Sequence, residues 1–112
     1  MQTSTDIAAR NKNAAYYGLS PRVYLDLGHF SIAAEKAGVK STAIKKGPLG
    51  QGARLELSGP DHNYEVLVGN GQMLLGRVNG EERTRLCEGS TNTQSQWNRM
   101  LDVLKASEGR AA

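Results

Sequence analysis

The sequence predicts an α+β domain: an antiparallel β-meander of four to five strands packed on a C-terminal helix, with a smaller helical N-terminal part. Two observations carry this prediction. Asn70-Gly71 and Asn79-Gly80 each separate runs of alternating apolar and polar residues, which is the strongest short signal for β-hairpins. A capping box that begins at Thr91 then precedes a run with the apolar spacing of a helix.

The hairpin registers follow from using both Asn-Gly pairs as two-residue loops and 59–62 as a four-residue loop. In the last hairpin, this places Arg77 opposite Glu82. One sheet face then collects the apolar residues Leu55, Leu57, Tyr64, Val66, Val68, Met73, Leu75 and Leu86. The opposite face collects the charged residues Arg54, Glu56, Glu65, Arg83 and Arg85, with Leu67 and Leu74 among them. A slip by one residue would exchange the two sets, so the segregation supports these registers.

The secondary structure of the segments before the meander is predicted from the residues that can cap a helix and from those that can end one. Residues 1–19 are expected to form an arm or a helix, because the stretch is polar and Gly18 is placed as a terminator. A single α+β domain is expected over 20–107. Residues 21–27 fit a strand by their alternation, and they also fit a helix that begins after Ser20 and ends at Gly28. We predict the strand, which lengthens the meander, and keep the helix as the alternative.

A short helix is predicted from Ile32 to Ala37, with Ser31 as its cap and Gly38 as its stop. The run 34–39, Ala-Glu-Lys-Ala-Gly-Val, resembles the helix-turn-helix of lac-repressor-type DNA-binding proteins. That resemblance implies a DNA-binding segment over 31–46, in which a second helix presents Lys40, Ser41, Thr42, Lys45 and Lys46 to the major groove or the phosphates. Gly47-Pro48 would end this second helix after about six residues, whereas helices in globular proteins average about 10–14.

The C-terminal helix is predicted from an apolar stripe at positions i, i+3, i+4 and i+7, formed by Trp97, Met100, Leu101 and Leu104. The apolar face of the meander needs a cover, and this helix can provide it. Beyond Ser107, residues 108–112 are expected to form a frayed tail.

Composition restricts the class of function. A chain of 112 residues with a formal net charge of +3 fits one small domain whose charge excess is modest. The single cysteine, Cys87, excludes an intramolecular disulfide and a multi-cysteine metal cage, so a cytoplasmic location is expected. No apolar run reaches the roughly 18 residues of a membrane span. His29 and His62 lie outside any ligand-spaced cluster, so no metal, cofactor or catalytic residue is expected.

These observations predict a non-enzymatic protein-interaction module, an inhibitor or accessory factor that binds a protein partner through its charged sheet face. The partner-binding residues would be Arg54, Leu67, Leu74, Arg83 and Arg85, since arginine and apolar area are both useful at interfaces. A small DNA-binding protein that uses the segment 31–46 is the alternative, in which nucleic acid replaces the protein partner.

Overall fold

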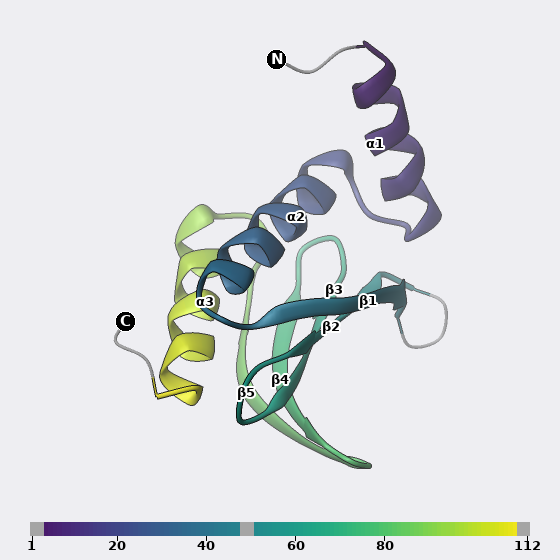
Figure 1. Cartoon of the computed structure of the whole chain (residues 1–112). Coiled ribbons are helices and arrows are strands. Elements are labelled where there is room, and N and C mark those ends of the chain that lie inside the picture. Colours follow the sequence, from purple (N-terminus) through teal and green to yellow (C-terminus); the bar gives the residue numbers. More distant parts are fainter. Residues whose placement is uncertain (1–3, 48–50, 110–112) are drawn as a thin grey trace.

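Five antiparallel strands form one sheet, and the helices pack beside it, in this computed structural model, which describes residues 4–47 and 51–109 (Figure 1). In chain order the elements are α1 (Ser4–Tyr16), α2 (Pro21–Lys36), β1 (Lys40–Lys46), β2 (Ala53–Ser58), β3 (Asn63–Val68), β4 (Met73–Asn79), β5 (Glu82–Gly89) and α3 (Gln94–Ser107). Neighbouring strands in the sheet are also consecutive in the sequence. The predicted α+β meander with a C-terminal helix and an N-terminal helical part is confirmed.

Helix α2 corrects two predictions, the strand over 21–27 and the separate helix that begins at Ser31. The Ser20 side chain accepts a hydrogen bond from the Val23 backbone N–H at 3.3 Å, and Pro21 occupies the first turn. Val23, Leu27, Phe30 and Ala34 are the buried residues of one continuous helix, spaced three or four residues apart. The alternation over 23–27 is too short to compete with this longer stripe. The fifth strand comes instead from Lys40–Lys46.

Both α2 and α3 lie on the same side of the sheet, where they cover its apolar face (Figure 1). The Trp97 side chain of α3 is only 3% exposed, and its ring centroid lies 6.0 Å from that of Phe30 in α2. The core between helices and sheet consists of Leu19, Val23, Leu27, Phe30, Ala34, Val39, Ala53, Leu55, Leu57, Tyr64, Val66, Val68, Met73, Leu75, Trp97, Met100 and Leu104. Two helices are needed because the apolar face spans several strands.

The predicted register is confirmed for β2 with β3 and for β3 with β4, where Val66 pairs with both Leu55 and Leu75. It is wrong for β4 with β5. Arg77 pairs with Thr84 instead of Glu82, because the chain turns at Gly80, whose φ is 64°, and Glu81. From the turn to Arg85, this shift of two residues keeps each side chain on its predicted face.

A bulge lies farther along the same pair of strands, between Leu75 and Gly76 of β4. Because Leu75 pairs with Cys87 and Gly76 pairs with Arg85, Leu86 is the extra residue of β5. Leu86 and Cys87 are both partly buried against the core. The bulge therefore allows two consecutive residues of β5 to contact the helix side of the sheet.

Helix α1 packs mainly on α2 and lies away from the body of the sheet (Figure 1). The Tyr17 ring stacks on Tyr24 of α2, with 6.1 Å between their centroids, and Ala14 is fully buried. The N-terminal segment is thus helical where the structure describes it. No helix within residues 4–47 and 51–109 is long and apolar enough to cross a membrane.

The chain just after α3 is anchored, so the frayed tail predicted from residue 108 does not begin there. The Tyr64 hydroxyl donates a hydrogen bond to the Glu108 carboxylate, and it lies 2.9 Å from the Ser107 hydroxyl oxygen. The same carboxylate accepts a hydrogen bond from the Asp61 backbone N–H at 3.3 Å. Residues 110–112 lie outside the described part of the chain.

We predict that Trp97→Ala lowers the free energy of unfolding by about 3–5 kcal/mol, because removal of the indole leaves a cavity between α2, α3 and the sheet. The substitution also removes the hydrogen bond from the indole N–H to the Thr91 carbonyl oxygen. Denaturant unfolding followed by circular dichroism measures the loss. An unchanged midpoint would contradict the packing described above.

We also predict a pH dependence that originates at Tyr64. Burial, followed by the hydrogen bond to Glu108, raises the pKa of Tyr64 from 10.0 to about 12. Between these two pH values the phenol ionises in the unfolded chain and stays neutral in the folded one, so the free energy of unfolding falls as the pH rises. Urea titrations at several pH values should show that this fall is smaller in Tyr64→Phe. Equal slopes for the two proteins would contradict the assignment.

Candidate docking face of the sheet

The candidate site is the outer face, which we define as the side of the sheet opposite α2 and α3. Among the described residues no helix packs on this face (Figure 1). Cross-strand pairing brings its charged and apolar residues together in rows: Arg54 pairs with Leu67, and Leu67 pairs with Leu74. The alternation of the strands thus places the predicted partner-binding residues Arg54, Leu67, Leu74, Arg83 and Arg85 on one face.

Glu65 is the centre of the charged part of the outer face. Its residue is only 4% exposed, although it lies on the face that no helix covers. Arg83 Nε donates a hydrogen bond to Glu65 Oε2 at 3.1 Å, and Arg54 Nε lies 3.8 Å from Oε1. Two guanidinium groups from β2 and β5 therefore flank one carboxylate from β3: Arg83 makes a charge-assisted hydrogen bond to it, and Arg54 makes a longer ion-pair contact.

The neighbouring ion pairs extend this arrangement across the sheet. Lys45 Nζ of β1 lies 3.1 Å from Glu56 Oε1, and Arg85 Nη1 of β5 lies 3.4 Å from Glu88 Oε2. These two pairs are largely exposed, so each contributes little to stability. The inner pairs at Glu65 have a different role, because they keep a nearly buried carboxylate neutralised.

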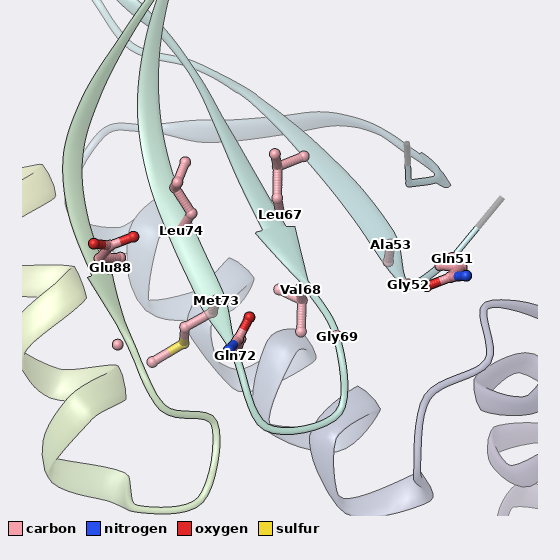
Figure 2. Close-up of a pocket in the computed structure, with 11 residues that line it drawn as sticks. Gln51, Gly52, Ala53, Leu67, Val68, Gly69, Gln72, Met73, Leu74 and Glu88 are labelled. Carbon is pink, nitrogen blue, oxygen red and sulfur yellow. The ribbon is translucent and has the colours of Figure 1, made fainter. Parts of the chain in front are cut away.

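Leu67 and Leu74 form the apolar part of the outer face. Both point away from the helices, whereas Val68 and Met73 point toward them (Figure 2). The two leucines line a hollow of about 640 Å³ at the end of the sheet where β2 begins. Glu88 is the charged residue on its wall.

A glycine forms one rim of this hollow. Gly52 has a φ of 68°, and a Cβ placed on it would lie 2.1 Å from the Val68 carbonyl oxygen. Only glycine allows so close an approach of the two backbones.

A second hollow on the outer face has a volume of about 370 Å³ and lies at the opposite end of the same strands. Glu65 and Arg83 line it, together with Thr42, Glu56 and Val78. The outer face thus has a hollow at each end, and Glu65 belongs to the lining of the second.

The helix-turn-helix expected over 31–46 is wrong, because Lys40–Lys46 is strand β1 and not a second helix. Gly38, with a φ of 92°, turns the chain from α2 into this strand, which pairs with β2. The five residues expected to face DNA do not share one surface: Lys45 lies on the outer face, whereas Lys46 lies 4.4 Å from the Tyr16 ring centroid of α1. Ser41 hydrogen-bonds Ser31 on the helix side. Lys40 is exposed at the start of the strand, and Thr42 Oγ1 donates to the Glu56 carbonyl oxygen.

Sequence reasoning identified Glu65 as one charge among several and missed that it is buried. The signal was present in the pairing, since the registers place Glu65 beside Glu56 on β2 and close to Arg54 and Arg83. Like charges directly opposite each other repel, so Glu56 and Glu65 need cations close by. This predicts that the side chains of Arg54 and Arg83 lie over the sheet toward Glu65.

The outer face carries ion pairs and partly buried leucines. Among the residues that the structure describes, no group of three histidine, cysteine or acidic side chains is placed to hold a metal ion. Comparisons with protein-family models, with curated proteins and with solved structures each found no match for this chain. The outer face offers guanidinium groups fixed by a carboxylate, beside two half-buried leucines in a hollow.

We predict that Glu65→Ala lowers the free energy of unfolding by about 2 kcal/mol, because Arg54 and Arg83 lose the carboxylate that both contact. Glu88→Ala is the matched control, since it removes an exposed carboxylate of the same face. Its effect should stay below about 0.5 kcal/mol. Denaturant unfolding of both variants checks this. Equal effects would show that Glu65 does not hold the arginines.

Proposed function

We propose that the protein is a non-enzymatic interaction module, an inhibitor or accessory factor, that binds a protein partner through the outer face of its sheet. The observation that carries the proposal is the arrangement of Arg54 and Arg83 around the nearly buried Glu65, next to Leu67 and Leu74. Arginine is enriched at protein interfaces and among their hot spots, and the buried core of an interface is more apolar than its rim.

The energetics of binding support this assignment. A long arginine side chain normally loses conformational freedom when a partner immobilises it, and this loss opposes binding. Here the contacts with Glu65 restrict both guanidinium groups before any partner arrives. Arg54 Nε is buried and makes no hydrogen bond within the described structure, although it lies 3.8 Å from Glu65 Oε1. The hydrogen bond from Arg83 to Glu65 therefore lowers the entropic cost of ordering Arg83 when a partner binds.

In this proposal the protein needs no cofactor and acts in the cytoplasm. Cys87 is a free cysteine and is partly buried against the core. A reducing compartment keeps such a thiol from forming disulfides with other chains. The partner would accordingly be another cytoplasmic protein.

The test uses two residues of the outer face that contribute little to the fold. The partner is first captured from native extract with the wild-type chain and identified by mass spectrometry. Leu74→Ala combined with Arg85→Ala should then weaken the complex by about 2 kcal/mol or more in a calorimetric titration, because interface arginines are frequent hot spots and truncation of Leu74 removes apolar area that the partner would bury. Arg83 is left in place because it holds Glu65.

The matched control is Asn98→Ala combined with Asp102→Ala, two exposed residues of α3 on the other side of the molecule. It should bind the partner as tightly as the wild type. Normal affinity for the outer-face variant, together with weaker binding by the α3 variant, would move the docking surface to the helices.

A further inference from the structure

A groove runs between α2 and β1, on the helix side of the sheet and apart from the outer face. A hollow of about 370 Å³ lies in it, lined mainly by Tyr24, Leu27, Gly28, Ile44 and Leu55. Ile44 is 38% exposed, which is high for an isoleucine that points toward a helix layer. The hydrogen bond between the hydroxyls of Ser31 and Ser41 joins α2 to β1 beside this hollow.

Strand β1 forms one wall of the groove and is an edge strand. In the sheet order it has β2 as a neighbour on one side, and its other side is the border of the sheet. After a bulge between Ser41 and Ala43, residues Ala43–Lys46 pair regularly with β2. Their outward backbone N–H and C=O groups can therefore accept another strand.

Gly28 forms part of the other wall, and nothing in the chain itself requires a glycine there. It lies in the interior of α2 and is exposed, a position where glycine destabilises a helix relative to alanine. A Cβ placed on Gly28 would meet no atom within 4 Å outside its own helix backbone. The chain thus keeps an open space beside an apolar hollow at a cost to its own stability.

We propose that an extended, acidic segment of a partner protein adds to the sheet as a strand beside Ala43–Lys46 and inserts an apolar side chain into the hollow over Gly28. The charge of β1 selects the partner's chemistry, because the strand carries three lysines and no acidic residue: Lys40 is exposed, Lys45 forms an ion pair with Glu56 of β2, and Lys46 lies against the Tyr16 ring. Lysine ammonium groups on this edge attract carboxylates from the added strand.

The orientation of the side chains gives the added segment a pattern. Ile44 pairs with Leu55 and faces the helices, whereas Lys45 lies on the outer face near Glu56. A strand paired with β1 therefore places an apolar residue next to Ile44 and an acidic residue next to Lys45. The segment should alternate apolar and acidic residues.

A second copy of this chain is disfavoured at the same edge when the two strands pair about their centre. Two β1 strands paired antiparallel about Ala43 would set Lys40 opposite Lys46, and like charges directly opposite each other destabilise a sheet. Lysines and a bulge are also common protection against strand addition. If β1 were only protected against strand addition, the apolar hollow and the glycine in α2 would not be needed. The inference does not rest on the outer face, which is a different surface.

The test is a selection of displayed peptides of about eight residues, within the range of natural strands, on the whole chain. We expect enrichment of sequences that alternate acidic and apolar residues. In amide NMR spectra, an enriched peptide should shift the signals of Ala43–Lys46 and protect them from hydrogen exchange. Gly28→Leu should fill the hollow and weaken binding by about tenfold or more, as expected for loss of a pocket. His29→Leu, an exposed neighbour in α2 outside the hollow, should leave binding unchanged.

Melting temperatures show that the variants are folded. Gly28→Leu and the smaller change Gly28→Ala should both melt at or above the wild-type temperature, since each favours the helix. The proposal is overturned if no sequence is enriched, if the enriched peptides shift the amides around Leu67 and Leu74 instead, or if folded Gly28→Leu binds as tightly as the wild type. Dimerisation of the free chain through β1 would also overturn it, because a second copy would then occupy the edge.

Discussion

The alternation of side chains along β2, β3 and β4 is the constraint on which the rest of the structure depends. Because the three strands share one register, Leu55, Val66 and Leu75 form a continuous apolar row. Both α2 and α3 pack on this face, and the charged residues lie on the other face. The outer face is therefore a consequence of where the helices pack. The nearly buried Glu65 is tolerated there because two arginines of the same face neutralise it.

The central register and the C-terminal helix could be predicted, because local chemistry specifies both. Segregation of apolar from charged residues determines how β2, β3 and β4 pair, and the apolar spacing from Trp97 to Leu104 determines α3. The predicted capping box is wrong: the N-cap is Thr93 without a side-chain hydrogen bond, and the Thr91 hydroxyl oxygen accepts one from the Gly71 N–H instead. The secondary structure of the residues before the meander could not be predicted from local chemistry. The alternation of Val23 and Leu27 is a local pattern, whereas the stripe that makes α2 a helix extends past Gly28 to Ala34.

The incorrect predictions for residues 34–46 and for the last hairpin also arise because local patterns were considered alone. Residues over 34–46 have a helical spacing of small and apolar side chains, but Lys40–Lys46 becomes a strand because β2 offers it a pairing edge. The bulge in the last hairpin likewise depends on how Leu86 and Cys87 pack against the core. In both places a contact distant in sequence outweighs a local preference, as is usual for strands.

The two proposed surfaces meet at β1. The Lys45 side chain lies on the outer face near Glu56, while its backbone belongs to the free edge of the sheet. A segment that pairs with β1 would therefore lie next to the arginines of the outer face. Edge and face together would form one larger binding region, in which strand pairing supplies affinity and the side chains supply specificity.

The central claim is that the outer face stays open to solvent in the free protein. Methyl relaxation in the presence of a soluble paramagnetic agent measures this residue by residue. The account predicts strong relaxation of the Leu67 and Leu74 methyl groups and weak relaxation of those of Leu55 and Leu75. Methyl groups of Leu67 and Leu74 as protected as those of Leu75 would show that the outer face is covered and would contradict the account.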